Sequence, residues 1–478
     1  MLVDAVLTHA ESRPDHPALV WPEQRLSYGE LGERVRRATT WLRRRGVKAG
    51  DCVALAMDRS PAAVILHLAT LALGATSVPL APDAGASVTA TVGRLLRPVW
   101  LEPGEAMWRE IGAQAPEAEE AEMPRVDPGA VALILCTSGT AGEPKCVKLT
   151  HRATAAAAAQ INAFTGLAAA DREILTLPLH HSFGLGRLRC LLVAGATGFV
   201  LPGTFRPERL LSAIRKEQAT VFAQVPAGIR LILAYGERAR AYAASIRRIE
   251  IGSAALTVAE REQVLALFPE ARICHHFGLT EASRSIFCEY HDLACRDKLD
   301  SLGRPAPGVE VALDDPQPAG DRLEGRLKVR GPHVCAGYAN PSLADVHASA
   351  DGWWPTEDRV RIDREGFLYS VGRESEMVNL GGYKVASAEI EERLLEVAGV
   401  RAAAVVGCPD PAAPTASVLV AFIQPVDPLQ PPAPADLQSH LYRVLEPYKV
   451  PSHFRFLAEL PRTENGKIRR AALQELGS

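Results

Sequence analysis

Short apolar segments that look like strands alternate with helix-like segments along most of this chain, and that alternation limits the possible folds more than any other feature. Apolar residues recur at helical spacing over 27–45, where Gly46 ends the pattern, and a strand-like segment follows at 52–57. A second helix is expected over 61–73 and a short strand over 77–80. Strands that alternate with helices form parallel sheets covered by helices, so the sequence predicts an α/β body.

The alternation continues beyond residue 130 and then gives way to another pattern. Strands are expected at 131–136, 174–177 and 220–224, with an alanine-rich helix after Thr150. From 302 to 334 the chain consists of short β-rich segments with frequent glycine and proline. That pattern indicates a smaller antiparallel or barrel-like subdomain.

The length and the C-terminal pattern together predict two domains. A chain of 478 residues is too long for one ordinary core. After Arg373 the residues read as strand, turn, helix and strand, so we place a large N-terminal α/β domain at 1–373 and a small α+β domain at 374–478. The proline-rich stretch 424–437 is expected to be a surface connection.

Composition excludes several classes of protein. A net charge of -3 gives no reason to expect nucleic acid or an anionic membrane as a partner. The nine cysteines show no C-x-x-C spacing, which favours a reducing, cytoplasmic compartment and buried thiols; Cys136 and Cys146 flank a loop described next but lie beside it. The N-terminus does not read as a secretory signal, and no apolar run reaches the roughly 20 residues that a membrane span needs.

The strongest local motif is the loop 137–145, Thr-Ser-Gly-Thr-Ala-Gly-Glu-Pro-Lys, which follows an apolar strand and is expected to precede a helix. Small hydroxyl and glycine residues let backbone amides approach a polyphosphate, and the lysine supplies charge. An ordinary surface turn is the alternative, and a Walker A loop is disfavoured because Glu-Pro stands between Gly142 and the lysine. The candidate phosphate-binding residues are Thr137, Ser138, Gly139, Thr140, Gly142 and Lys145.

This loop resembles the phosphate-binding loop of the acyl-adenylate-forming superfamily of AMP-dependent synthetases and ligases, and further motifs match in order. Residues 276–281, His-Phe-Gly-Leu-Thr-Glu, are similar to the family's Y-G-x-T-E segment. By this resemblance Phe277 contacts adenine, Thr280 binds the α-phosphate and Glu281 holds Mg²⁺. Residues 252–256 resemble the G-G-A-P-L turn along the nucleotide, which adds Gly252, Ser253 and Ala254 to the nucleotide site.

Two downstream motifs imply ribose contacts and a hinge. Residues 352–358 are similar to G-W-x-x-T-G-D, so Asp358 is expected to accept hydrogen bonds from the ribose, although Glu357 replaces a glycine. Arg373 is expected to contact the ribose as well. The hinge position falls on Ser375, which lacks the charge that relatives often carry there.

The C-terminal motifs imply a mobile domain that closes over the site. Residues 461–470 resemble P-x-T-x-x-G-K-[IL], and Lys467 matches the lysine that balances charge during adenylate formation. Gly381 and Gly382, with Lys384, resemble the channel of synthetases that admit a pantetheine arm.

The acid pocket is implied by residues 178–184, which align with a P-L-F-H-x-x-G stretch of acyl-CoA synthetases and place His181 near the carboxylate. Amino-acid-activating relatives usually carry an aspartate in this stretch, where Phe183 stands instead. We therefore expect an acid without an α-ammonium group, such as a fatty or aryl acid. Residues 224–227 and Gly278 are expected to line the pocket.

The function implied is ATP- and Mg²⁺-dependent conversion of a carboxylic acid into acyl-AMP with release of pyrophosphate, followed by transfer to a thiol. CoA is the leading acceptor. The alternative acceptor is a carrier-protein phosphopantetheine or a nitrogen nucleophile. A carrier is expected to act in trans, because no carrier domain follows Ser478. A non-catalytic nucleotide-binding protein, suggested by the departures at Ala141, Cys146 and Glu357, is the alternative of another class.

Overall fold

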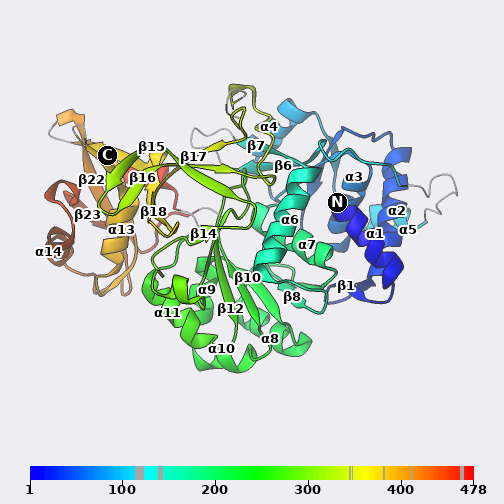
Figure 1. The fold of residues 1–478 in the computed structure, drawn as a ribbon, viewed down its shortest axis with the longest axis horizontal. Helices are drawn as coiled ribbons and strands as arrows, with labels where there is room; N and C mark the ends of the chain where they lie inside the picture. The colour runs from blue at the N-terminus through cyan, green and yellow to red at the C-terminus, as the bar shows by residue number, and fades with distance from the viewer. Residues whose placement is uncertain are drawn as a thin grey trace. The chain divides into compact units, whose positions relative to one another are not determined.

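The computed structural model in Figure 1 has a mixed α/β fold with a large N-terminal part and a small C-terminal part, as predicted. It describes residues 1–113, 123–137, 144–343, 346, 348–380, 383–410, 413–462 and 468–477. The chain divides into two compact units, Met1–Ala312 with Lys328–Pro355, and Leu313–Leu327 with Thr356–Ser478. The expected boundary between residues 373 and 374 stays a prediction.

The first sheet of the large unit has five strands in the order β5-β3-β4-β6-β7. Helix α2 begins after Ser27, whose hydroxyl accepts a hydrogen bond from the Glu30 amide in a capping box. The helix ends before Gly46, which has a φ of 81°. These bounds confirm the helix predicted over 27–45. The elements to this point are α1 (Leu2–Ser12), β1 (Pro17–Val20), β2 (Arg25–Ser27), α2 (Tyr28–Arg44), β3 (Cys52–Ala56), α3 (Pro61–Ala72), β4 (Thr76–Leu80), α4 (Ala86–Leu96), β5 (Val99–Leu101), α5 (Glu105–Ala113), β6 (Val131–Thr137) and β7 (Lys145–Thr150).

The helix expected after Thr150 begins at His151, as predicted, but a strand that was not predicted stands between the loop and this helix. Strand β7 pairs with β6 as an antiparallel strand. The segment Lys145–Thr150 was not recognised as a strand because it is short and carries two lysines, and on its other edge it bonds to residues 336–339, far along the chain.

The second sheet has nine strands in the order β14-β13-β12-β11-β10-β8-β9-β1-β2. Strands β12, β11, β10, β8 and β9 are mutually parallel, which confirms the predicted parallel sheet. The strand expected at 174–177 lies two residues earlier, because only 172–175 pair with β9. The elements are α6 (His151–Thr165), β8 (Arg172–Leu175), α7 (Ser182–Ala194), β9 (Thr197–Val200), α8 (Pro207–Glu217), β10 (Val221–Gln224), α9 (Pro226–Leu233), α10 (Glu237–Tyr242), β11 (Arg248–Ile251), α11 (Val258–Leu267), β12 (Arg272–Phe277), β13 (Ile286–Glu289), α12 (Leu293–Arg296) and β14 (Arg304–Pro305).

The β-rich stretch predicted near 302–334 contributes to a four-stranded sheet, β15-β16-β17-β18, in which β17 and β18 are antiparallel. A hairpin, β19 and β20, leads from it to the C-terminal residues. The elements are β15 (Glu310–Ala319), β16 (Arg322–Arg330), the 3-10 turn η1 (Pro341–Leu343), β17 (Trp354–Ile362), β18 (Leu368–Arg373), the 3-10 turn η2 (Glu374–Glu376), β19 (Met377–Leu380) and β20 (Tyr383–Ala386).

The C-terminal residues form a three-stranded sheet, β21-β22-β23, with separate apolar clusters on its two faces. Successive residues 403–406 alternate between the clusters, as strand geometry requires. The proline-rich stretch is a connection only in part: α14 begins at Pro434, where proline suits a first helical turn. The elements are α13 (Ser387–Leu395), β21 (Val400–Asp410), β22 (Ala413–Pro425), α14 (Pro434–Val444), the 3-10 turn η3 (Pro447–Lys449), β23 (His453–Phe456) and α15 (Arg470–Gly477).

Within the described residues, none of the helices has the length and apolar character that crossing a membrane requires.

Candidate active site

The predicted acid and nucleotide segments of the large unit follow the carboxyl ends of four parallel strands. Residues 178–184 come after β8, and residues 252–256 come directly after β11. Residues 224–227 begin at the last residue of β10, and residues 277–281 begin at the last residue of β12. Because these strands are adjacent and parallel, all four segments meet at one edge of the sheet. Ligands of open α/β sheets bind at this edge, so the fold supports a site there.

Gly252 lets the chain cross closely over His276 on the neighbouring strand. A Cβ atom on Gly252 would lie 2.0 Å from Cε1 of His276, so no larger residue fits without displacing that ring. Ser253 follows with a φ of 77°, a conformation that costs little for glycine and more for serine. Ser253 and Ala254 are exposed, as expected of a turn that runs along a ligand.

The segment from Phe277 to Glu281 is held by contacts at both ends. Phe277 is the last residue of β12 and pairs with Ile286 of β13. The amide of Cys335 donates to the carbonyl of Glu281 at 2.8 Å. The side chains of Phe277, Thr280 and Glu281 are half-buried, so each remains open to a ligand.

Tyr338 links the predicted phosphate lysine to the predicted magnesium carboxylate. Its hydroxyl donates to Oε1 of Glu281 at 2.5 Å, and Nζ of Lys145 lies 6.0 Å from its ring centroid. Tyr338 is positioned by a bridge to Val147 of β7. Tyr338 was not predicted from the sequence, because it stands in a short Cys-Ala-Gly-Tyr-Ala segment that matches none of the motifs.

The Glu281 side chain fits a magnesium site of the kind that forms around phosphates. Mg²⁺ in such sites takes one or two carboxylates, with phosphate oxygens and water completing the shell. Glu281 supplies one carboxylate that is half-buried and oriented by Tyr338. Among the described residues there is no group of three or more metal-ligating side chains, so any ion there depends on the nucleotide. A bound ion would neutralise phosphate charge.

His181 and Phe183 bring the predicted acid segment against the nucleotide segment. His181 lies just before α7, with its ring centroid 4.1 Å from that of His180. Phe183 contacts His276 edge-on, with ring centroids 4.7 Å apart. Burial lowers the pKa of His180, so the neutral imidazole is favoured beside His181.

A buried charge network lies within the same strands and was not anticipated from the sequence. Arg187 of α7 donates two hydrogen bonds to the Glu173 carboxylate, at 2.8 and 2.6 Å, and a third to Glu250 at 2.5 Å. Nε of Arg284 donates to the other oxygen of Glu250, and His276 Nδ1 lies 2.9 Å from that oxygen. Burial alone would raise the pKa of Glu250, but Arg284 and Arg187 hold it well below its usual range.

Arg284 connects this network to the acid segment. Its Nη2 donates to the carbonyl of Phe183 at 3.1 Å, and its guanidinium lies 4.9 Å from the Phe183 ring centroid. The network therefore fixes the position of Phe183 and His276 at once.

In the small unit, Asp358 and Arg373 are directly opposite each other on β17 and β18. Nε of Arg373 donates to Oδ1 of Asp358 at 3.2 Å. Oδ2 of Asp358 is buried and has no hydrogen-bond partner among the described residues. Burial raises the pKa of Asp358, and Arg373 opposes that rise. A buried oxygen without a donor is what a site awaiting a ribose hydroxyl would present.

The predicted hinge and channel residues lie on the connection that follows. Ser375 lies in the 3-10 turn Glu374–Glu376 between β18 and β19. Lys384 lies on β20, opposite Asn379. The predicted residues Ser138, Gly139, Thr140, Gly142, Gly381, Gly382 and Lys467 lie outside the described residues.

A match to two family models decides the family. Residues 6–339 match the AMP-binding enzyme model, and residues 389–467 match the model of the AMP-binding enzyme C-terminal domain. The chain belongs to the AMP-binding enzyme family. The resemblance inferred from the motifs is therefore confirmed.

Relatives of this AMP-binding enzyme include ligases of similar length. A feruloyl-CoA synthase from Amycolatopsis is 31% identical, over 93% of this chain and 92% of its own length. An indoleacetate–CoA ligase from Aromatoleum aromaticum is 32% identical, over 98% of this chain and 96% of its own. The ATP-bound structure of MatB from Rhodopseudomonas palustris shares the fold, with a TM-score of 0.87 at 24% identity over 100% of this chain and 99% of that one.

The enzyme is thus an AMP-forming acid–thiol ligase, which uses ATP to activate a carboxylic acid as an acyl-adenylate. The roles of its individual residues remain predictions.

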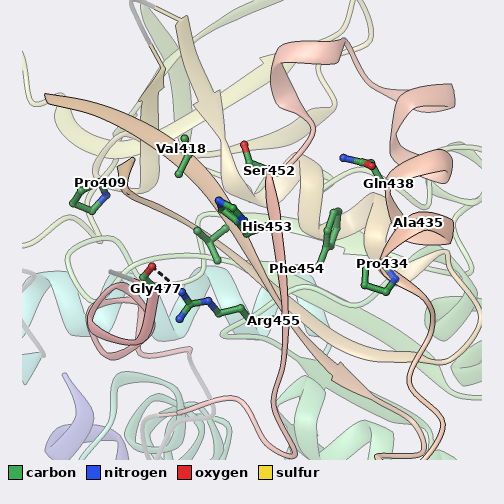
Figure 2. A pocket seen from close by; sticks show the side chains of 11 residues that line it. Pro409, Val418, Pro434, Ala435, Gln438, Ser452, His453, Phe454, Arg455 and Gly477 are labelled. Atoms are coloured by element: carbon green, nitrogen blue, oxygen red, sulfur yellow. Dashed lines mark hydrogen bonds between the residues drawn. The ribbon is translucent and has the colours of Figure 1, made fainter. Parts of the chain in front are cut away.

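A hollow of about 450 Å³ lies in the small unit. Figure 2 shows its lining, which comes from β21, β22, β23, α14 and α15 and includes none of the predicted site residues. Nothing ties this hollow to the ligase reaction.

Proposed function

We propose that this ligase converts an aromatic or arylalkanoic acid into its CoA thioester. The observation that carries the proposal is Phe183, a buried ring at the segment where amino-acid-activating relatives place a carboxylate. Phe183 forms an apolar cluster with Leu177, Ala223 and Val225 at the ends of β8 and β10. An apolar cluster of this kind suits a ring and gives an ammonium group no counter-charge.

Acidic residues are absent from three of the four strand-end segments, and the one in the fourth, Glu281, accepts a hydrogen bond from Tyr338. Neither 176–184 nor 224–227 nor 252–256 contains aspartate or glutamate. The nearby carboxylates of Glu173 and Glu250 are bound to buried arginines. The relatives support the same class of acid, since a feruloyl-CoA synthase, an indoleacetate–CoA ligase and a 3-hydroxybenzoate–CoA ligase all act on aromatic acids by name.

In the proposed mechanism, a carboxylate oxygen of the acid attacks the α-phosphorus of ATP, and pyrophosphate leaves. Lys467 would offset the negative charge that accumulates on the α-phosphate, and Thr280 would donate a hydrogen bond to it. Lys145 would hold the other phosphates, and Glu281 would hold magnesium, which would neutralise part of their charge. After rotation at Ser375, a thiol attacks the adenylate carbonyl and AMP leaves.

We propose CoA as the acceptor and the cytoplasm as the compartment. The relatives named above are CoA ligases, and the similarity extends over nearly their whole length. A carrier-protein acceptor lacks support from full-length relatives of this kind. All nine cysteines are free, as a reducing compartment favours.

The test is a panel of acids assayed with ATP, Mg²⁺ and CoA, with pyrophosphate release and thioester formation followed separately. Ferulate, indoleacetate, 3-hydroxybenzoate, hexanoate and phenylalanine distinguish ring, chain and ammonium. We expect the highest kcat/KM with ferulate, indoleacetate or 3-hydroxybenzoate, and no activity with phenylalanine, whose ammonium group has no counter-charge. A preference for hexanoate or phenylalanine would contradict the proposed acid class, and adenylate without thioester would contradict CoA.

The matched variant is Phe183→Ala, which removes the ring from the apolar cluster and its edge-on contact with His276 and leaves the predicted nucleotide residues themselves unchanged. We expect a rise in KM for the aromatic acid of about tenfold or more, because burial of a ring is worth roughly 2 kcal/mol. The KM for ATP should not change. Equal rises in the KM for the acid and the KM for ATP would indicate a general loss of structure.

A further inference from the structure

Two cysteines lie opposite each other at the end of the β6–β7 hairpin. Cys136 of β6 and Cys146 of β7 are register partners, and their Sγ atoms are 3.5 Å apart in a thiol–thiol hydrogen bond. The next residues along the two strands are Thr137 and Lys145, both predicted to bind phosphate. The pair therefore stands at the entrance to the predicted phosphate loop.

The pairing geometry brings the two side chains close together. The Cys146 amide donates to Oδ1 of Asn340 at 2.7 Å, and its carbonyl accepts from the Ala339 amide at 2.8 Å. Both backbone groups of Cys146 thus point away from β6, so Cys136 and Cys146 form a non-hydrogen-bonded pair. Such pairs have Cα atoms about 4.5 Å apart, within the range that a disulfide spans.

The two thiols differ in their access to solvent. Cys146 is fully buried in the cluster formed with Ile134 and Val78, whereas Cys136 packs against the same cluster and is only partly buried. A small oxidant can therefore reach Cys136 first, with Cys146 already in position to complete the reaction.

We propose that Cys136 and Cys146 form a reversible disulfide when a hydroperoxide oxidises the enzyme. The Cys136 thiolate attacks one peroxide oxygen, which breaks the O–O bond and yields a sulfenic acid and, with hydrogen peroxide, one water. The Cys146 sulfur then attacks the Cys136 sulfur and displaces a second water. Two thiols and one peroxide thus give one disulfide and two waters, a two-electron oxidation that thiols reverse.

Disulfide formation should weaken ATP use. A disulfide brings the sulfurs from 3.5 Å to about 2.05 Å and locks the two side chains together, which restrains the strand ends where Thr137 and Lys145 flank the loop. We expect the KM for ATP to rise several-fold. The reaction should be slow at neutral pH and faster at higher pH, since the hydrogen bond with Cys146 and burial both raise the pKa of Cys136.

The bond itself is tested by mass spectrometry, independently of the proposed function. Reduced enzyme is treated with hydrogen peroxide, alkylated and digested with trypsin, which separates Cys136, in peptide 126–145, from Cys146, in peptide 146–148. We expect these two peptides to be joined and to separate on reduction. Unlinked sulfinic acid at Cys136, or a link between Cys288 and Cys295 alone, would overturn the proposal.

The effect on ATP is tested with matched variants. Cys136→Ser and Cys136→Ala should retain the basal activity and lose the rise in the KM for ATP that peroxide causes. Cys52→Ser, which removes the other partly buried cysteine, should keep that rise. A peroxide effect of equal size in Cys136→Ser and wild type would overturn the link to ATP. Failure of the acid assay would leave the mass result standing, so the two proposals fail separately.

Discussion

Replacing Glu250 with glutamine tests whether the buried charge network stabilises the large unit. The substitution keeps the size of the side chain and removes its charge. The Glu250 side chain is 3% exposed, and its two oxygens accept from Arg187 and Arg284, each at 2.5 Å. With Glu173 the wild-type network holds two carboxylates and two guanidinium groups, so the variant buries one uncompensated positive charge.

The expected loss follows from that unpaired charge. Removing one partner of a buried ion pair costs about 3–5 kcal/mol. At roughly 2 °C per kcal/mol for a domain of this size, the unfolding temperature should fall by about 6–10 °C, measured by scanning calorimetry at pH 7.5. Because the pKa of Glu250 is depressed, its stabilisation is present above the ordinary carboxyl pKa and is lost as the pH falls below it.

The control is Glu310→Gln, which breaks an exposed pair with Arg330 and should leave the unfolding temperature unchanged. If Glu250→Gln unfolded within 1–2 °C of wild type near neutral pH, by the same roughly 2 °C per kcal/mol, the network would not stabilise the unit as argued.

Four further outcomes are expected. Asp358→Asn should lower kcat/KM for ATP about 10–100-fold, because hydrogen bonds to a charged acceptor are worth roughly 1.5–3 kcal/mol; an unchanged value would remove Asp358 from the ribose site. Tyr338→Phe should raise the Mg²⁺ concentration for half-maximal rate several-fold by freeing Glu281, and an unchanged magnesium curve would argue against that link. Burial lowers the pKa of His333 to about 4, so protonation of this residue in the unfolded chain should cost wild type roughly 3 kcal/mol of stability as the pH falls from 6.5 to 4. In urea titrations, His333→Gln should show a smaller dependence of the unfolding free energy on pH. Lys467→Ala should abolish adenylate formation yet spare thiolysis of supplied acyl-adenylate; wild-type adenylate formation would refute its role.

Local signals predicted the elements whose causes are local. Helix α2 was readable because its cap at Ser27, its apolar spacing and the stop at Gly46 all lie within the segment itself. The strand predicted at 220–224 was readable from its own apolar residues and matches β10, whereas the strand expected at 174–177 lies two residues earlier.

Long-range contacts explain what the sequence did not predict. Tyr338 reaches Glu281 only because the segment around it pairs with β7, which lies far away in the sequence. Glu250 and Arg187 read as surface charges until the fold buries them together. Strand β7 was missed although β6 is close in the sequence, because it is short, carries two lysines and has its other edge bonded to distant residues.

The central claim, that the acid becomes an acyl-adenylate, is tested most directly with an acid carrying ¹⁸O at both oxygens of its carboxylate. If that oxygen attacks the α-phosphorus and the thiol later attacks the carbonyl, the AMP released must carry one ¹⁸O and be 2 Da heavier in its mass spectrum, by the atom balance of the two steps. Unlabelled AMP, or ADP in place of AMP, would contradict the account.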